Sequence, residues 1–444
     1  MNAFMQNDKT FSWLSYLIYL YPLFLILGPS INNFSQIVIC LSSIYLIFKK
    51  KIIIPKNQKN IFFILIFLFF YSFFITYYNG NYFFLKNTLI FLKIIFVTIL
   101  INYLIFMKIF ELKKFVHISS VILIIVILDT FFQFIYGKNL IGYEIEPNNL
   151  IRLTSFFKDE YVVGSFIARI YLPVLIFITF SIKNQNHKFW FFLLFSIIIN
   201  ISIFITGERA SVGITFINFC MLFVFIKNLR KVIIYKFLIS ILVIFTIFLM
   251  SDKLKDRYIQ NTLQSTFKLF NKHNEQINPQ TIYDSHYGAI YLASLEIAKE
   301  SILFGQGMRS YRINSCDEKI KEKIKLEIKN KTNHSQFICS THPHNYLLEL
   351  ILDLGLFGFT IFMILIYLIF KKLIIFKKKD ITKLEKFLII SFAIHSLSTF
   401  WPLSTHGSLF SSWNSTFFIF NISLFIALSC NYMKYDLKKS NLIK

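Results

Sequence analysis

The sequence has few acidic residues, few glycines and few prolines, and each scarcity narrows the class of protein. Only 23 aspartates and glutamates stand against 47 lysines and arginines, which gives the 444-residue chain a formal net charge of +24. Among the 13 glycines and 8 prolines there is no internal repeat, no proline-rich linker and no nucleotide-binding glycine motif. The pattern therefore indicates neither a repeat array nor a glycine loop that binds a nucleotide phosphate.

The start of the sequence is not expected to be a cleavable signal peptide. Met1 to Thr10 is polar and has no basic cluster before the first apolar run. A secretory signal begins with such a positively charged region, and the apolar segment after it is removed. We therefore expect the first apolar run to be retained as part of the folded chain.

Apolar residues are abundant instead. They make up 56% of the chain, and the mean hydropathy is +0.60. They fall in runs of about 17–25 residues, the length that crosses a bilayer as a helix, without the alternation of membrane-barrel strands. The sequence therefore predicts an all-α polytopic membrane protein with about 12 transmembrane helices. The predicted spans lie at about residues 12–28, 32–48, 61–78, 87–106, 115–136, 164–182, 189–206, 211–226, 237–250, 346–370, 387–403 and 415–432.

Lysine and arginine are shared unevenly between the two sides of this map. The short segments on the side of the termini carry 26 of them, and those on the other side carry 5. Cytoplasmic loops are the basic ones, so both termini are expected in the cytoplasm. This topology accounts for the positive charge without a nucleic acid partner. It divides the chain into spans one to nine (1–250), one large periplasmic loop (251–345), and spans ten to twelve with a cytoplasmic tail (346–444).

The stretch Thr341-His342-Pro343-His344-Asn345 joins the large loop to an apolar helix. Pro343 suits the first turn of that helix, because its missing N–H would be unpaired there in any case. His344 and Asn345 then lie beside unpaired N–H groups and the positive end of the helix dipole. That field disfavours imidazolium, so His344 is expected to be neutral at about pH 7 and able to accept a proton.

Polar residues continue along one face of the same helix. Asn345, Glu349 and Asp353 recur every four residues, and side chains at this spacing are neighbours. Two carboxylates on a membrane helix are costly unless they face a polar interior. Gly355 and Gly358 mark a spot where another helix can pack closely.

Two other interpretations of the histidines are open. A pair such as His342 and His344 fits zinc, but no further cluster of His, Cys or Asp at ligand spacing supports a metal site. The second alternative is a loop histidine that merely caps the helix. The local sequence does not separate these roles from general-base chemistry.

A very short turn, Gly207-Glu208-Arg209, separates the seventh and eighth predicted spans on the outer side. Because this turn is too short to reach far into water, the Arg209 guanidinium is expected to stay near the bilayer surface. Phosphate is the ligand that suits a fixed cationic fork at that place. The alternative is that Arg209 is only an interfacial anchor.

Several further polar residues are expected on the outer side. Asp129 and Gln133 lie four residues apart near the end of the fifth span, Arg152 lies in the next loop, and Arg169 lies inside the sixth span. Asp129, Arg152 and Arg169 fit a buried structural ion pair as well as they fit a binding site. Their roles stay open at the level of sequence.

At these residues the sequence resembles the O-antigen ligase and O-antigen polymerase superfamily. The main pattern is His344-Asn345, nine residues, Gly355, two residues and Gly358. Further features similar to that family are the Gly207-Glu208-Arg209 turn, the large outer loop, residues 285–307 and the map of twelve spans. The resemblance covers most of the chain after the fourth predicted span.

The resemblance implies a membrane glycosyltransferase that needs no metal or cofactor. Such enzymes use undecaprenyl-diphosphate-linked glycans at the periplasmic face of the Gram-negative inner membrane. In that scheme Arg209 holds the diphosphate, and His344 takes the proton of the acceptor hydroxyl. Asn345 and Glu349 orient the reacting groups, and Glu208 counts among the substrate-binding candidates. A single displacement would invert the anomeric centre.

One departure from the family concerns the second cation. The Ser285-His286-Tyr287 region has no arginine where many relatives carry one before the amphipathic helix. A second contact to the diphosphate must then come from another residue. The candidates from the sequence are Arg152, Arg309 and Arg312.

The resemblance leaves the acceptor open. A ligase transfers the glycan to lipid A core, whereas a polymerase transfers it to a second lipid-linked glycan with the same donor chemistry. A rival from another class is a non-enzymatic flippase of lipid-linked glycans, which also has about twelve spans. A transporter places its key polar residues at mid-bilayer, often in repeated halves. Here they gather at the outer interface, so an enzyme that works among membrane lipids is favoured.

The five cysteines divide into two groups. Three lie within apolar spans, where cysteine acts as a small packing residue: Cys40, Cys220 and Cys430. Cys316 and Cys339 are the two in the large loop, where an oxidising periplasm favours a disulfide. Two free thiols are the alternative, because sequence fixes no Cα separation. A bridge would enclose the lysine-rich residues 319–331, which are expected to be solvated.

Overall fold

The computed structural model describes residues 12–51, 54–145, 152–260, 286–327, 338–375, 382–402 and 407–440, and these residues are helical, without a β-strand. The first half of the chain contains α1 (Trp13–Tyr19), α2 (Tyr21–Leu27), α3 (Pro29–Phe48), α4 (Lys59–Tyr78), α5 (Leu89–Phe106), α6 (Leu112–Tyr136), α7 (Val163–Ser181), α8 (Gln185–Ile205), α9 (Arg209–Phe225) and α10 (Arg230–Met250). The second half contains α11 (Asp252–Lys255), α12 (His286–Glu300), α13 (Ser310–Asn314), α14 (Glu318–Glu327), α16 (Tyr346–Ile375), α17 (Lys383–Ser398) and α18 (Ser412–Ser440).

Within the described ranges, nine helices are long and apolar enough to cross a membrane, so the chain is a multi-pass membrane protein. They correspond to predicted spans two to seven, nine, ten and twelve. The eighth and eleventh predicted spans are shorter helices, α9 with 17 residues and α17 with 16. The first predicted span is divided into α1 and α2, because Pro22 lies in the first turn of α2 and cannot continue a helix that began earlier.

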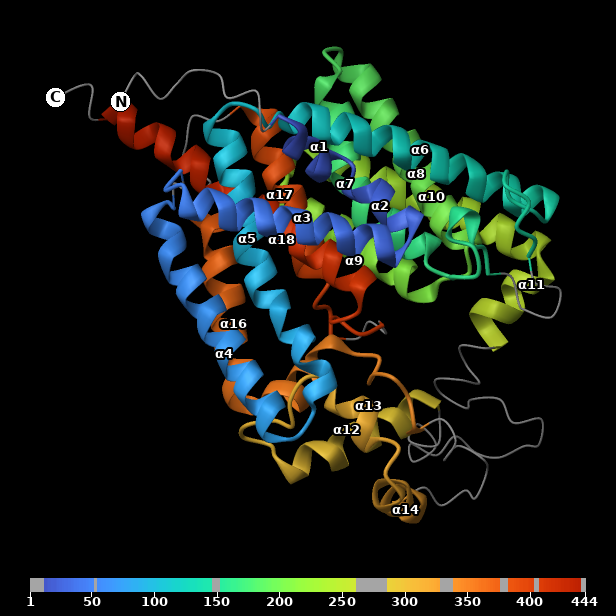
Figure 1. Ribbon diagram of the computed structural model, residues 1–444. Coiled ribbons are helices and arrows are strands. Elements are labelled where there is room, and N and C mark those ends of the chain that lie inside the picture. Colours follow the sequence, from blue (N-terminus) through green and yellow to red (C-terminus); the bar gives the residue numbers. More distant parts are fainter. Residues whose placement is uncertain are drawn as a thin grey trace.

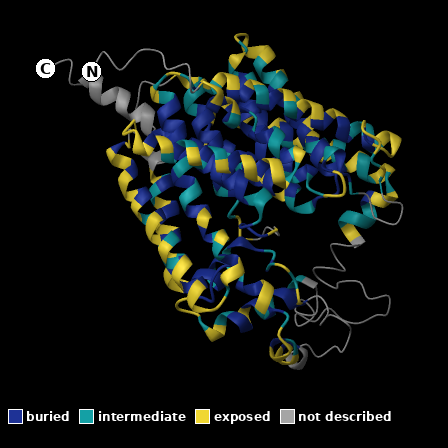
Figure 2. Ribbon diagram, in the orientation of Figure 1, coloured by how far each residue is buried: buried dark blue, intermediate teal, exposed yellow. Residues whose placement is uncertain are grey.

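The centre of the bundle is formed by α7 and α18. In the apolar window of α18 83% of the residues are buried, and in that of α7 78%, against 22% for α10 and 33% for α3. Figure 2 shows the buried residues gathered in the middle of the bundle, with exposed side chains along its outer helices. The exposed apolar side chains of the peripheral helices suit contact with lipid.

Two helices lead away from this centre towards the loop helices. Figure 1 shows α4 and α16 side by side, with α12, α13 and α14 grouped at their end. The loop helices have a small hydrophobic core of their own, distinct from that of the bundle. Ile320 and Ile324 of α14 belong to it. The expectation that residues 319–331 are merely solvated is therefore wrong for these two side chains, which lie four residues apart on one face.

The histidine helix is broken at Gly355, although the sequence predicts one continuous span over residues 346–370. Gly355 has φ 64° and ψ 178°, so α16 consists of two helical pieces that meet there. The loop after α12 runs beside the break: Gln306 N–H donates to the Leu352 carbonyl at 2.9 Å, and Leu356 N–H donates to the Ile302 carbonyl at 2.9 Å. These bonds satisfy backbone groups that the break removes from the helix.

Glycine is required where the loop after α12 crosses α16. A Cβ on Gly355 would lie 2.4 Å from the backbone nitrogen of Gly305. A Cβ on Gly358 would lie 2.6 Å from the ring of Tyr71 in α4. The predicted close approach at both glycines therefore exists, but at Gly355 the neighbour is a loop backbone and not a helix.

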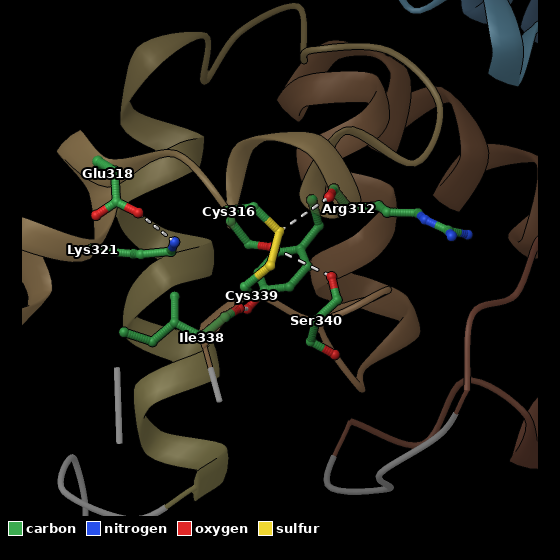
Figure 3. The surroundings of a disulfide bond; sticks show 9 residues. Arg312, Cys316, Glu318, Lys321, Ile338, Cys339 and Ser340 are labelled. Atoms are coloured by element: carbon green, nitrogen blue, oxygen red, sulfur yellow. Dashed lines mark hydrogen bonds and ion pairs between the residues drawn. A yellow bond between two sulfur atoms is a disulfide. The ribbon is translucent and has the colours of Figure 1, made fainter. Parts of the chain in front are cut away.

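Cys316 and Cys339 are joined by a disulfide, with their Cα atoms 4.5 Å apart. Figure 3 shows the bond between the end of α13 and the segment that leads to the histidines. Next to it, the Tyr311 hydroxyl donates to the Ile338 carbonyl at 2.9 Å. Both contacts fix the chain shortly before residue 341. Cys40 and Cys220 are free and half-buried; the side chain of Cys430 lies outside the described residues.

Candidate active site

The loop over residues 341–344, which we call the histidine loop, is held in place by the side chain of Asn345. Its Oδ1 accepts from the backbone N–H groups of Leu347 at 2.9 Å and Leu348 at 3.2 Å, and its Nδ2 donates to the Pro402 carbonyl. Asn345 is therefore the N-cap of α16, which begins at Tyr346. The expectation that Pro343 lies in the first turn of the helix is wrong, because the cap comes two residues later.

His344 lies just outside the helix, in the loop before the cap. Its backbone has φ 54°, a conformation that is uncommon for a residue other than glycine. Its ring centroid is 4.1 Å from that of His342 and 5.6 Å from that of Tyr287, whose ring meets it edge-on. His342 Nδ1 is 2.7 Å from the Thr341 hydroxyl oxygen. His344 as a whole is half-buried.

The two carboxylates on α16 accept hydrogen bonds from other parts of the chain. Glu349 accepts from the Ser408 hydroxyl and from the Leu409 N–H at 2.8 Å, which anchors the loop before α18. Asp353 accepts from the N–H groups of Arg309 at 2.8 Å and Ser310 at 3.1 Å. Both carboxylates are almost fully buried. Glu349, expected from the sequence to orient the reacting groups, is bonded to the loop before α18.

Arg309 and Arg312 differ in their relation to the histidine loop. Arg309 Nη2 donates to the Thr341 carbonyl at 3.5 Å, so its guanidinium lies against that loop. Arg312 is exposed, and Figure 3 shows its side chain extending away from the disulfide. Among the residues that the structure describes, no contact joins the Arg312 side chain to the histidines or to the other arginines. Of these two candidates for the second cation, only Arg309 adjoins the histidine loop.

Three arginines gather at the turn between α8 and α9. Arg257 Nε donates to the Gly207 carbonyl at 3.0 Å, which places the side chain beside Arg209. Burial, together with the positive charges of Arg152 and Arg209, lowers the pKa of Arg257 to about 10. Charges influence each other in this way only over short distances. We call Arg152, Arg209 and Arg257 the arginine cluster.

The chain reversal after α10 brings Arg257 to this place. α11 and a single π-helical turn over Asp256–Gln260 fold back over the end of α8. The Tyr258 hydroxyl donates to the Phe204 carbonyl at 2.8 Å, and the two rings stack with centroids 4.5 Å apart. Sequence reasoning missed Arg257, since it placed residue 257 in the large loop and assigned no local structure there. A tyrosine next to an arginine directly after an apolar helix is the one local signal of a folded turn.

Glu208, a substrate-binding candidate from the sequence, is engaged by α7. Its carboxylate accepts from the backbone N–H groups of Gly164 at 2.6 Å and Ser165 at 3.0 Å, and from the Ser211 hydroxyl at 3.0 Å. Burial raises the pKa of Glu208, and these bonds and the charge of Arg152 act in the opposite direction. Glu208 thus fixes the Gly207-Glu208-Arg209 turn against α7, next to Arg209.

Tyr287 lies between the arginine cluster and the histidine pair. Its ring contacts His344, and its phenol lies near enough to Arg257 that a phenolate there would raise the pKa of that guanidinium. Tyr287 belongs to the first turn of α12, in residues 285–307. The structure therefore brings together the Arg209 turn, the Arg257 turn and the histidine loop, which lie far apart in the sequence.

Arg169 has a structural role. Its Nη1 donates to the Asn414 side-chain carbonyl at 2.6 Å, and its Nη2 donates to the Tyr346 hydroxyl at 3.3 Å. Its guanidinium also lies over the rings of Trp413 and Phe417, at 5.3 and 5.4 Å. The partners are an amide, a phenol and aromatic faces, and not the carboxylate that an ion pair requires. Arg169 joins the start of α16 to the start of α18.

Metal ligands do not gather in the described part of the chain, where no three residues among His, Cys, Asp and Glu are grouped as a ligand set. The groups that face the histidine pair are a tyrosine and a backbone-bound arginine. The arrangement offers a proton acceptor beside fixed positive charge. That combination suits the displacement of an anionic leaving group.

Comparison with known families gives one match. Residues 190–363 match the family model described as O-antigen ligase. The matched segment runs from α8 into α16, so it contains Arg209, Arg257, Tyr287 and His344. No curated protein matches the chain.

Proposed function

We propose a specific reaction for this chain, which belongs to the O-antigen ligase and polymerase superfamily of membrane glycosyltransferases. The chain transfers a glycan from undecaprenyl diphosphate to a hydroxyl of lipid A core at the periplasmic face of the inner membrane. The observation that supports this most directly is that Tyr287 contacts His344 and lies near Arg257. The proposed proton acceptor and the arginine cluster thus both lie near Tyr287.

The reaction is a single displacement at the anomeric carbon. The acceptor hydroxyl oxygen forms a bond to that carbon while the bond to the diphosphate oxygen breaks, and the electron pair leaves with the diphosphate. His344 takes the hydroxyl proton as the new bond forms. Attack from the side opposite the leaving group inverts the anomeric centre. Because the diphosphate is already a good leaving group, the enzyme mainly supplies position, charge and a base.

The arginine cluster holds the leaving diphosphate in this scheme. Arg209 lies at the first position of α9, beside Arg257, and Arg152 completes the group. Guanidinium groups form paired hydrogen bonds to phosphate oxygens and stay charged when half-buried. Arg257 thereby takes the place of the arginine that residues 285–287 lack. These fixed charges, and not a divalent ion, neutralise the leaving group, so transfer is expected to continue in EDTA.

A reconstituted assay tests this reaction. The purified full-length protein in lipid nanodiscs receives the lipid-linked glycan isolated from the cells that carry the gene, with lipid A core as the acceptor. The proposal predicts glycan joined to lipid A core, in the presence of EDTA and without added metal. Glycan chains that lengthen on undecaprenyl diphosphate instead would assign polymerase activity. Absence of any transfer from a donor that the protein binds would overturn the proposal.

A further inference from the structure

A cavity of about 320 Å³ opens between the two described ends of the connection from α6 to α7, residues 137–145 and 152–162. Its volume falls at the lower end of the range for small-ligand sites, about 300–1,000 Å³. The side chains that carry the argument are Tyr143, Glu144, Arg152, Lys158, Asp159 and Tyr161. Two are cations, two are carboxylates and two are phenols.

Hydrogen bonds of Gln133, near the end of α6, hold the walls of this cavity together. Its Oε1 accepts from the backbone N–H groups of Thr154 at 3.0 Å and Ser155 at 2.8 Å. Its Nε2 donates to the Tyr143 carbonyl at 3.3 Å. One fully buried amide therefore ties the Tyr143 wall to the Thr154 wall.

Asp129 adds a second cross-link of the same kind. Its carboxylate accepts from the Leu140 N–H at 2.8 Å and from the Ser155 hydroxyl. Asp129 and Gln133 thus bind the two loops and not a cation, which decides the question that their spacing leaves open. The Asp129 and Gln133 side chains are fully buried and hydrogen-bonded to the chain itself. These bonds therefore fix the walls of the cavity before any ligand binds.

The cavity adjoins the arginine cluster through the segment that starts at Arg152. The Leu153 N–H donates to the Thr206 carbonyl at 3.3 Å, directly before the Gly207-Glu208-Arg209 turn. The Arg152 guanidinium lies over the Tyr161 ring at 4.4 Å, inside the cavity wall. The charge of Arg152 also reaches Arg257. Arg152 therefore belongs to both the cavity and the cluster.

We propose that this cavity is a saccharide subsite, which holds the sugar joined to the diphosphate of the donor. The proposal rests on the proposed function, because that function places the diphosphate at the arginine cluster. Glu144 and Asp159 accept hydrogen bonds from sugar hydroxyls, and Lys158 donates one. The rings of Tyr143 and Tyr161 supply apolar faces for the C–H side of a sugar ring.

The lining carries both signs of charge, since Glu144 and Asp159 balance the formal charges of Lys158 and Arg152. These side chains offer both hydrogen-bond acceptors and donors to the hydroxyl groups of a sugar ring. The lining therefore suits a sugar ring with several free hydroxyls next to the diphosphate.

Binding to two probes tests the subsite in the full-length protein in nanodiscs. One probe is undecaprenyl diphosphate without a sugar, and the other is the lipid-linked glycan from the cells that carry the gene. The test variant combines Glu144→Gln with Asp159→Asn, which keeps the shapes of two exposed side chains and removes their charge. The control is Glu160→Gln, next to Asp159 but outside the cavity lining.

We expect the double variant to bind the lipid-linked glycan about tenfold more weakly, since a hydrogen bond to a charged group is lost. Its affinity for undecaprenyl diphosphate stays at the wild-type value, and Glu160→Gln binds both probes normally. Wild-type affinity of the double variant for the glycan would overturn the subsite, as would an equal loss for both probes. If the proposed function is wrong, the result differs: wild-type protein would bind neither probe.

Discussion

At the scale of single residues, Arg257 shows how residues that are distant in the sequence fix the position of a cation. Its Nε bonds to Gly207 at the α8–α9 turn, and its pKa of about 10 leaves it positively charged at neutral pH. The sequence around residue 257 gives a single local signal of the turn, a tyrosine next to an arginine, and does not show that the turn packs against Gly207. Arg209 was predictable, since a three-residue turn between two spans leaves its side chain little choice of place.

Arg257→Lys keeps the positive charge but loses the planar fork and the bond to Gly207. We expect the rate of glycan transfer to fall about 10- to 100-fold, because the leaving diphosphate loses a paired contact. Arg312→Lys is the matched control, since Arg312 is exposed and apart from the cluster. Steady-state transfer rates with lipid-linked donor measure both variants. Equal rates for Arg257→Lys and the wild type would remove Arg257 from the site.

At the scale of elements, the broken helix α16 decides where the histidine loop lies. The sequence indicates an apolar span and two tight glycine positions there, and both exist. It does not indicate the break, because the break depends on a loop that binds backbone groups of residues 352–357 from about fifty residues earlier. The same holds for Glu349: its spacing shows that it faces inward, but its partners Ser408 and Leu409 come from another loop.

Gly355→Ala should destabilise this junction. Its positive φ costs a residue with a side chain about 1–2 kcal/mol, and the added Cβ would meet backbone atoms of the Gly305 loop. Gly213→Ala in α9 is the control, since a Cβ there meets nothing within 4 Å. Thermal unfolding in detergent should show a lower midpoint for Gly355→Ala and an unchanged or higher one for Gly213→Ala. Equal midpoints for the two variants would argue against a strained crossing.

The disulfide between Cys316 and Cys339 ties α13 to the segment before the histidines. A closed loop of this length is stabilised by roughly 3 kcal/mol in chain-entropy models. We expect both cysteines to resist alkylation until the protein is reduced, as read by mass spectrometry of the loop peptides. Cys40 and Cys220, which are free, provide the internal comparison after unfolding. Alkylation of Cys316 and Cys339 without reduction, in protein from an oxidising compartment, would reject the bridge.

At the scale of the whole molecule, composition predicted the class and connectivity decided the rest. Runs of apolar residues indicated a helical membrane protein, and nine described helices are long enough to cross. The predicted twelve spans include α9 and α17, which are shorter, and a first span that Pro22 divides. Length and hydropathy cannot separate a short buried helix from one that crosses the membrane. The apolar side chains of a helix can be buried by neighbouring helices as well as by lipid.

The uneven lysine and arginine distribution predicts which side the site faces. A cysteine placed at Glu160 should react with a membrane-impermeant maleimide in intact spheroplasts, whereas one at Glu385 should react only after lysis. Glu160 lies in the loop before α7, and Glu385 lies in the first turn of α17. The background replaces Cys40, Cys220 and Cys430 by serine. Labelling of Glu385→Cys in intact spheroplasts would reverse the topology and place the arginine cluster in the cytoplasm.

The central claim is that His344 accepts the proton of the acceptor hydroxyl beside a bound diphosphate. The most direct measurement compares the transfer rates of His344→Ala, His342→Ala and wild-type protein in the nanodisc assay, with undecaprenyl diphosphate binding measured on the same samples. We predict that His344→Ala loses about 10²–10⁴-fold in rate, the contribution of a general base, while it still binds undecaprenyl diphosphate; His342→Ala loses less. Near-normal transfer by His344→Ala would contradict the claim.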